Sequence, residues 1–264
     1  MSTPATGGES ANYLARLSTL TLLSFAQLLR PASHPQSGEA VRRLQRHALL
    51  LMALGAVAVV ALMFGFDVRE ISLMPPRGAP GLWPVRILTD FGKAANVLWS
   101  VAALLPMVAL VAPRLQGGSR SRLLRFGTEL QFIFLAVLLP ILAGEVIKWI
   151  VGRGRPFVGG EANAFNFSHF AGTQAYASFP SAHAITGAAL AFAVSALWPR
   201  ARVAMIVYAL LIIASRLVLL AHHPSDVVAG ALIGVVGAMV VRYWFAARGL
   251  GFVIGHAGAI TPPM

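Results

Sequence analysis

The stretch SRLVLLAHHPSD, residues 215–226, places an arginine inside an apolar run and follows it with two histidines and an aspartate. A charged side chain at membrane depth costs roughly 2.5–3.5 kcal/mol, so such a residue tends to mark a functional site. The first candidates for chemistry are therefore Ser215, Arg216, His222 and Asp226.

Two further clusters combine basic, hydroxyl and imidazole groups in the same way. One is KWIVGRGRP, residues 148–156, and the other is SFPSAH, residues 178–183. The planar guanidinium of arginine matches phosphate oxygens, and the free N–H groups of a helix that begins within PSAH attract an anion. Together the clusters predict a site that neutralises a phosphoryl group during its transfer. The predicted phosphate ligands are Lys148, Arg155, Ser181 and Arg216.

The two histidines and the aspartate predict the catalytic groups of this site. If His223 caps a helix that begins at Pro224, Asp226 falls three residues past the cap and can reach back. Its carboxylate then lies near the imidazole of His222, fixes the tautomer and strengthens the other ring nitrogen as a nucleophile. His183, at another helix start, can donate a proton to the leaving oxygen and later activate water. This set predicts a phosphohistidine mechanism.

Some polar residues allow other interpretations. Two histidines and an aspartate also suit zinc, but the surrounding cations repel a metal ion and attract an anion. Arg153 is either a second phosphate contact or an anchor at the membrane interface, and Glu145 can simply pair with Lys148 one turn later. The histidines assigned to ordinary structural positions are His34, His47, His169 and His256.

Long apolar segments must position these clusters. Hydrophobic residues make up 57% of the 264 residues and charged residues 11%, whereas a soluble domain carries about 25% charged residues. A membrane crossing takes roughly 17–25 residues, and six blocks approach this length. We therefore expect an all-α polytopic membrane protein, a bundle of six transmembrane helices with all three clusters at helix ends on one side. The blocks are 48–66, 94–112, 130–147, 182–198, 203–221 and 227–241, the last extending to about 245.

The distribution of positive charge predicts the orientation of this bundle. The net charge is +12, but the Lys and Arg residues divide 13 to 8 between alternate connectors, which is typical of topology and attraction to anionic lipid and argues against a nucleic-acid partner. Positive charge collects on the cytoplasmic side. We therefore expect a protein of the bacterial inner membrane with both termini in the cytoplasm and the active site facing the periplasm or exterior.

Three regions follow from the composition along the chain. Residues 1–10 are typical of disorder, and residues 12–29 have a helical spacing that suits an amphipathic helix in the membrane interface. The expected regions are a cytoplasmic tail with this interfacial helix at 1–47, the six-helix domain at 48–245 and a C-terminal tail at 246–264.

The connectors and one glycine pair carry further expectations. The four prolines of the outer segment 67–93 exclude a continuous helix, so we expect this segment to cover the outer face. The inner connectors 113–126 and 198–202 are expected to be tight turns. Gly230 and Gly234 form a small-xxx-small pair that favours close helix packing.

The three clusters together resemble the membrane branch of the type-2 phosphatidic acid phosphatase superfamily, whose soluble relatives include bacterial acid phosphatases and vanadium haloperoxidases. That family combines Lys-x6-Arg-Pro, Pro-Ser-Gly-His and Ser-Arg-x5-His-x3-Asp. This chain carries all three in order over residues 148–226, with 23 and 31 residues between them. The matching positions are Lys148, Arg155, Pro156, Pro180, Ser181, Ala182, His183, Ser215, Arg216, His222 and Asp226.

The resemblance implies a role for each matched residue. His222 rather than His223 would be the nucleophile, Asp226 its orienting partner and His183 the acid–base residue. Lys148, Arg155, Ser181 and Arg216 would hold the phosphate, without a metal or other cofactor. Ala182 stands where the family usually has glycine, so a methyl group enters where the backbone approaches the phosphate, which is a liability if that position needs a positive φ.

Three functions remain open from the sequence. The first is a phosphatase for a membrane lipid, with phosphatidic acid, phosphatidylglycerol phosphate, undecaprenyl diphosphate and the phosphates of lipid A as the candidates that the family implies. The second is a lipid phosphotransferase, in which another lipid replaces water as the acceptor. The third is a non-catalytic anion or lipid transporter. The complete set of His183, His222 and Asp226 favours an enzyme, because binding alone needs no nucleophile.

Overall fold

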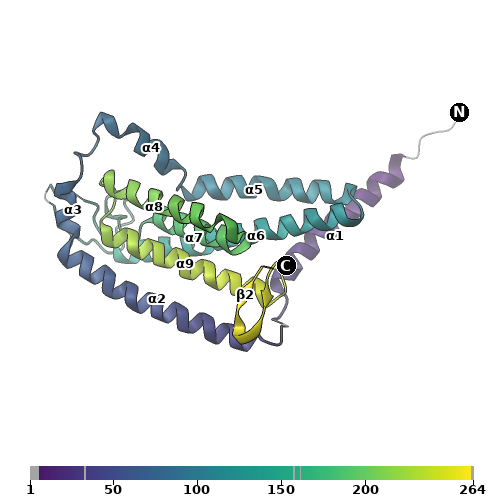
Figure 1. Cartoon of the computed structure of the whole chain (residues 1–264). Helices are drawn as coiled ribbons and strands as arrows, with labels where there is room; N and C mark the ends of the chain where they lie inside the picture. Colours follow the sequence, from purple (N-terminus) through teal and green to yellow (C-terminus); the bar gives the residue numbers. More distant parts are fainter. Residues whose placement is uncertain (1–5, 33, 157, 161, 263–264) are drawn as a thin grey trace.

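The structure, a computed structural model, describes residues 6–32, 34–156, 158–160 and 162–262. Helices dominate these residues, and one short two-stranded antiparallel sheet joins them (Figure 1). The expected all-α class is thereby confirmed. The elements are α1 (Thr6–Leu29), α2 (Ser37–Gly65), α3 (Asp67–Leu73), η1 (Pro80–Leu82), α4 (Trp83–Asp90), α5 (Ala94–Val111), η2 (Ala112–Arg114), α6 (Gly117–Val151), η3 (Gln174–Tyr176), α7 (Ala182–Leu197), η4 (Pro199–Ala201), α8 (Arg202–Val218), α9 (Pro224–Ala246), β1 (Val253–Ile254), η5 (His256–Gly258) and β2 (Ile260–Thr261).

Five helical stretches among the described residues are long and apolar enough to cross a membrane, so the expected count of six crossings is not confirmed. The exception is α7, whose 16 residues span about 24 Å against a hydrocarbon core of about 30 Å. It packs against α6, α8 and α9 in the middle of the bundle. A block of this composition resembles a crossing in sequence because burial in protein and exposure to lipid both select apolar residues. The five stretches are Ser37–Gly65, Pro80–Arg114, Gly117–Val151, Pro199–Val218 and Pro224–Ala246.

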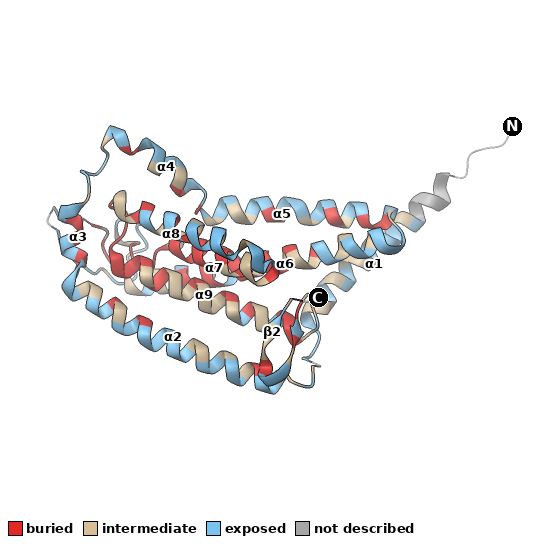
Figure 2. Ribbon diagram, viewed as in Figure 1, coloured by how far each residue is buried: buried red, intermediate tan, exposed pale blue. Residues whose placement is uncertain are grey.

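Buried side chains gather on α7 and on the faces of α6 and α9 that meet it, whereas α2 and α5 are largely exposed (Figure 2). The exposed faces carry large apolar side chains such as Leu54 and Trp99, which suits contact with lipid tails. Gly230 and Gly234 let α9 approach α7, because a Cβ at either position would overlap the backbone oxygen of Ser181 or Ile185. The predicted packing role of this glycine pair is confirmed.

The N-terminal region differs from the expectation at one point. Residues 1–5 lie outside the described residues, but α1 already begins at Thr6, so the expected disorder of residues 6–10 is wrong. No proline interrupts this stretch, and the helix predicted over 12–29 extends backwards through it. α1 runs obliquely away from the end of the bundle opposite α3 (Figure 1), and Tyr13 Oη donates to Leu110 O over 2.8 Å. Its placement in the membrane interface remains a prediction.

The inner connectors are shorter than expected, and the outer segment 67–93 contains regular helices. α2 begins at Ser37, inside the region assigned to the tail, and α6 begins at Gly117, so the tight turn predicted over 113–126 is wrong for all but its first residues. The outer segment 67–93 forms α3, η1 and α4 at one end of the bundle, where α4 packs on α8. At the other end, the β1–β2 hairpin packs on the start of α2 through η5.

Candidate active site

The ends of α6, α7, α8 and α9 meet beside the outer segment. Gly152 ends α6 in the left-handed conformation, and a side chain there would overlap Ser168 O, so only glycine allows the chain to turn back at this point. The returning loop is fixed by Ser168 N donating to Gly152 O over 2.7 Å and by Ser178 N donating to Arg153 O over 3.0 Å. These bonds carry the chain from the last turn of α6 to the first turn of α7.

The start of α7 lies against the start of α9, because Ser181 N donates to Asp226 O over 3.1 Å. Two predicted site atoms here, Ser181 Oγ and His183 Nε2, are buried and have no hydrogen-bond partner among the described residues. Ala182 is the first residue of α7 and is absent from the described residues with positive φ. The methyl group that replaces the family's glycine therefore causes no backbone strain.

His222 is almost completely buried, and one of its ring nitrogens is committed to the backbone. Its Nδ1 lies 2.7 Å from Ser178 O. Because a carbonyl oxygen only accepts, Nδ1 carries the proton and Nε2 keeps its lone pair. Burial lowers the pKa of His222 well below 6.5, and the nearby charges of Arg216 and Arg155 lower it further against the opposing effect of Asp226. At neutral pH the residue is therefore an uncharged imidazole with a bare Nε2.

Asp226 is the third residue after the helix cap His223, as predicted, but it contacts His222 only through Ser178. His223 caps α9, and its N–H donates to Asp226 Oδ2 over 2.8 Å. The carboxylate lies near His222, yet its distance to His222 Nδ1 is 3.9 Å, beyond a hydrogen bond. Ser178 joins the two, since its hydroxyl donates to Asp226 Oδ2 over 2.6 Å while its carbonyl accepts from His222. The expected direct pairing is replaced by this relay.

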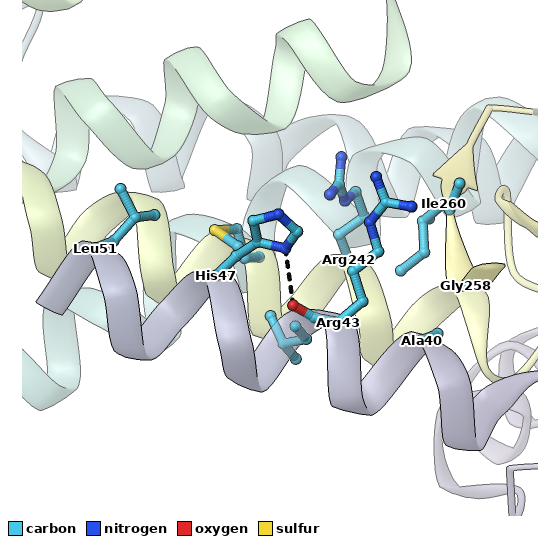
Figure 3. A pocket seen from close by; sticks show the side chains of 10 residues that line it. Ala40, Arg43, His47, Leu51, Arg242, Gly258 and Ile260 are labelled. Carbon is cyan, nitrogen blue, oxygen red and sulfur yellow. Dashed lines mark hydrogen bonds between the residues drawn. The ribbon is translucent and has the colours of Figure 1, made fainter.

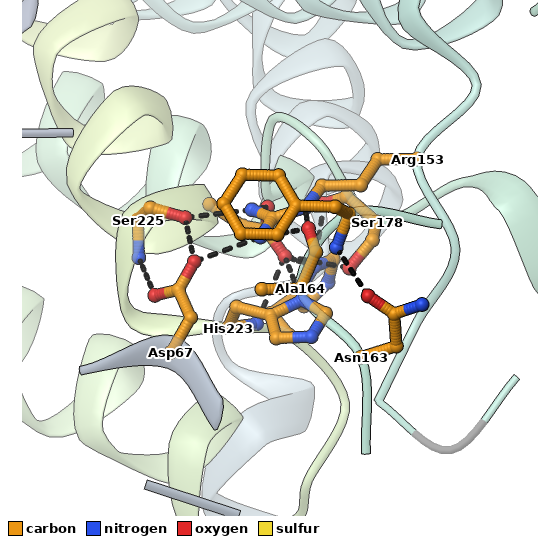
Figure 4. A network of polar contacts seen from close by, with 10 residues as sticks. Asp67, Arg153, Asn163, Ala164, Ser178, His223 and Ser225 are labelled. Carbon is orange, nitrogen blue, oxygen red and sulfur yellow. Dashed lines mark hydrogen bonds and ion pairs between the residues drawn. The ribbon is translucent and has the colours of Figure 1, made fainter. Parts of the chain in front are cut away.

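Arg153 is the centre of a buried ion network, shown in Figure 4, and fits neither of the two roles considered for it. Its Nη1 donates to Asp226 Oδ1 over 2.6 Å, and its Nη2 donates to Asp67 Oδ2 over 2.8 Å. Ser225 lies between the acids, accepting from Arg153 Nη1 over 2.6 Å and donating its N–H to Asp67 Oδ1 over 3.0 Å. Arg153 thus holds Asp226 in place and does not face the phosphate site.

Sequence reasoning missed Asp67, Ser178 and Ser225. The only signal for Asp67 was a single acid directly after a long apolar run, where charge is expensive unless it is paired. Ser225 is one of the unspecified positions of the third motif and Ser178 stands two residues before the second, but serine is too common for its position alone to indicate a role.

Two arginines surround the histidines with positive charge. Arg216 is 8% exposed, and its Nη1 donates to Thr89 Oγ1 of α4 over 2.7 Å. Arg155 is partly exposed, with Nη2 3.4 Å from Gln174 Oε1, and burial together with the charge of Arg77 lowers its pKa below the usual value of an arginine. Both guanidinium charges act on His222 and on His183. The structure therefore brings these four predicted residues together.

Lys148 is less closely integrated than the other predicted ligands. It occupies the last turn of α6 and forms an ion pair with Glu145, which was the alternative considered for that acid. Within the described part of the chain this is the only polar contact recorded for its side chain. The described residues also contain no group of three or more His, Asp or Glu side chains placed to hold a metal ion.

A bare imidazole nitrogen near two arginines and a second imidazole has the chemistry that a nucleophile, an anion-binding site and an acid–base group for phosphoryl transfer require. The fold and this site define a membrane-bound phosphatase. Comparison with known proteins agrees, since the PAP2 superfamily pattern matches residues 129–250.

Two curated relatives are similar over most of the chain. A protein of Rhizobium johnstonii named lipid A 1-phosphatase is 30% identical over 84% of this chain and 90% of its own length. A protein of the same name from Rhizobium etli is 30% identical over 81% of this chain and 91% of its own length. No solved structure matches the chain significantly. The chain belongs to the PAP2 superfamily.

Proposed function

We propose that this protein hydrolyses the phosphate ester of a membrane lipid through a phosphohistidine formed on His222. The observation that carries the proposal is the hydrogen bond from His222 Nδ1 to Ser178 O, which leaves Nε2 unprotonated within reach of the Arg155 and Arg216 charges. A binding protein for anions would need the cations but not a buried imidazole oriented in this way.

The reaction follows from the positions of the two histidines. His222 Nε2 donates its lone pair to phosphorus while the bond from phosphorus to the lipid oxygen breaks. His183, which takes up a proton when the negatively charged phosphate offsets the arginine charges, gives that proton to the lipid oxygen. A water molecule then attacks the phosphohistidine, His183 takes a proton from it, and the bond between Nε2 and phosphorus breaks. Arg155, Arg216 and the unpartnered hydroxyl of Ser181 stabilise the charge on the phosphoryl oxygens in both steps.

The substrate class is suggested by the surroundings of the site. The apolar faces exposed on α2 and α5 support helix ends at a bilayer surface, and both curated relatives are named lipid A 1-phosphatase. We therefore propose lipid A with a 1-phosphate as the first substrate to test. Purified protein should release inorganic phosphate from it faster than from phosphatidic acid, phosphatidylglycerol phosphate or undecaprenyl diphosphate. Loss of the lipid phosphate without release of inorganic phosphate would instead indicate a phosphotransferase.

The covalent step has its own test. With a lipid labelled on the phosphate, a rapid base quench should trap label on the protein, and the adduct should be stable in base and labile in acid, as a phosphohistidine is. His183→Ala should slow both the formation and the hydrolysis of this adduct, because each step then lacks its proton-transfer group, while His222→Ala should trap none. Release of phosphate by His222→Ala at the wild-type rate would refute the mechanism.

We further propose a bacterial inner membrane location with the active site on the periplasmic side and both termini in the cytoplasm. The support is the division of basic residues, which favours the α1 end of the bundle as cytoplasmic. Ala162 lies in the exposed loop at the other end, and the chain has no cysteine. A reagent that cannot cross the inner membrane should label Ala162→Cys in intact cells. Labelling only after lysis would place the site in the cytoplasm.

A further inference from the structure

A cavity of about 430 Å³ lies at the end of the bundle opposite the phosphatase site, between α2, α9 and the C-terminal hairpin. Two arginines enter it from different helices, Arg43 from α2 and Arg242 from α9 (Figure 3). His47 lines it one turn further along α2, and its ring nitrogen Nδ1 donates to Arg43 O over 2.8 Å. A second hollow of about 320 Å³, which shares Arg43, is lined by Arg42, Arg43, Arg46 and Ala257.

The positive charge of this cavity lacks a protein counter-charge. Neither Arg43 nor Arg242 forms an ion pair with an acid in the described ranges, although the two guanidinium charges act on each other. Arg242 Nε is buried without a hydrogen-bond partner there. Glu39, the one acid of α2, is exposed and forms no recorded ion pair. The two guanidinium groups repel each other because no described acid lies between them. A bound anion would reduce this repulsion.

The fold holds the arginines in this arrangement. Gly258 seats the hairpin against α2, since a side chain there would approach Ala40 N to 2.6 Å, and its φ of +70° suits glycine. Arg43 Nη1 reaches Ala257 O over 3.4 Å, and the Arg242 guanidinium lies 4.9 Å from the ring centre of Phe192. The cavity is therefore shaped by three packed elements rather than by surface side chains alone.

The remaining walls are apolar, and they continue into the membrane-facing surface. Leu44, Leu51 and Met239 line the cavity beside the arginines. Leu50 and Leu54, next along α2, are exposed on the part of the helix that is apolar enough to cross a membrane. In a bilayer crossed by α2, this apolar wall would lead from the arginines toward the acyl chains. Basic pockets between membrane helices with this layout bind the headgroups of anionic lipids.

We propose that this cavity binds the phosphodiester headgroup of an anionic glycerophospholipid from the leaflet opposite the phosphatase site, with Arg43 and Arg242 on the phosphate and an acyl chain along Leu51. The guanidinium groups supply charge-assisted hydrogen bonds to phosphate oxygens. The bound lipid would tie α2, which is otherwise largely exposed, to α9 and to the hairpin. This inference does not depend on the substrate of the phosphatase site.

The test is lipid binding by the full chain and by two double variants. Native mass spectrometry of purified protein should detect phosphatidylglycerol bound in preference to phosphatidylcholine, and phosphatidylglycerol should raise the thermal midpoint. In Arg43→Gln/Arg242→Gln the affinity for phosphatidylglycerol should fall about 30-fold, as expected for the loss of two cationic contacts. Phosphatase activity should persist in this variant, which shows that it is folded.

The matched control removes two exposed arginines from the same end of the bundle, Arg122→Gln/Arg200→Gln, and should leave the affinity within about 2-fold of wild type. Equal weakening in both double variants would show a general surface attraction and overturn the proposal. Stabilisation by inorganic phosphate at the same concentration as the lipid would identify a free anion as the occupant, which also overturns it. Equal binding of phosphatidylcholine would do the same.

Discussion

Replacing Arg153 with methionine should destabilise the protein strongly, whereas the same replacement of Arg155, two residues later, should inactivate it without unfolding it. Arg153 is 1% exposed and donates to both Asp226 and Asp67, each of which is fully buried. Methionine has a similar length and no charge, so Arg153→Met leaves two buried carboxylates without their common partner.

The size of the effect follows from that loss. Removing one partner of a buried ion pair costs about 3–5 kcal/mol, because the remaining charge stays in a medium of low polarity. For a chain of this size about 1 kcal/mol corresponds to roughly 2–4 °C in the thermal midpoint, so the midpoint should fall by about 6–20 °C. Arg155 is partly exposed, and its one recorded side-chain hydrogen bond, to Gln174, spans 3.4 Å, so Arg155→Met should shift the midpoint little.

The assay pairs thermal unfolding in detergent with phosphate release from the lipid substrate. Arg155→Met should lose about two to three orders of magnitude in kcat, as is typical when a donor to transition-state charge is removed. Arg153→Met should mainly lower the thermal midpoint. Its activity should also fall, because Asp226 loses the partner that holds it in position. If Arg153→Met keeps the wild-type midpoint while Arg155→Met lowers it, the assignment of the two arginines is reversed and the reasoning fails.

Three further outcomes test the site. His222→Ala should abolish turnover while retaining the fold and the binding of vanadate, whereas full turnover in His222→Ala with none in His223→Ala would show that the register of the motif is wrong. EDTA should leave activity intact and vanadate should inhibit, since the site centre offers arginines to a pentacoordinate anion; activity lost in chelator and restored by zinc would contradict this. Burial, followed by the charges of Asp67 and Asp226, raises the pKa of Glu70 to about 7. The folded state therefore keeps a proton that the unfolded state releases near pH 4.5. Because the folded state binds more protons, the free energy of unfolding should fall as pH rises from 4.5 to 7. Glu70→Gln should remove this slope and raise the stability at pH 8 relative to wild type. Glu129→Gln, which breaks the pair with Arg125, should keep the slope; an unchanged slope in Glu70→Gln would exclude Glu70 as its source.

Several residues of the candidate site could be predicted because their type and their position in the chain together indicate a role. Arg216 in an apolar run, His183 at a helix start and Asp226 three residues beyond a cap each have few alternatives. The cap itself was predicted from Pro224 and is present in the structure. Such local rules act within a few residues, so the sequence carries them directly.

The parts that sequence reasoning missed depend on contacts between distant segments. Asp67 and Arg153 are 86 residues apart and meet only because α3 lies beside the start of α9. Ser178 orients His222 through a backbone carbonyl, which every residue possesses and no sequence pattern marks. The sixth crossing, predicted at α7, is not confirmed for a different reason: a helix buried among other helices and a helix facing lipid are equally apolar.

The Asp67 ion pair also explains how α2 finds its position against the bundle. Lipid solvates an apolar helix face as well as protein does, so hydrophobic residues alone do not fix how far α2 slides along α9. A slip of one turn would move Asp67 by about 5.4 Å and leave its carboxylate and Arg153 unmatched in a dry interior, at the cost of several kcal/mol. The ion pair therefore destabilises the slipped registers more than it stabilises the native register. Arg153 also holds Asp226, so only Asp226 and Ser178 separate the pair that sets the register of α2 from the proposed nucleophile His222. An error in packing would then become an error in catalysis.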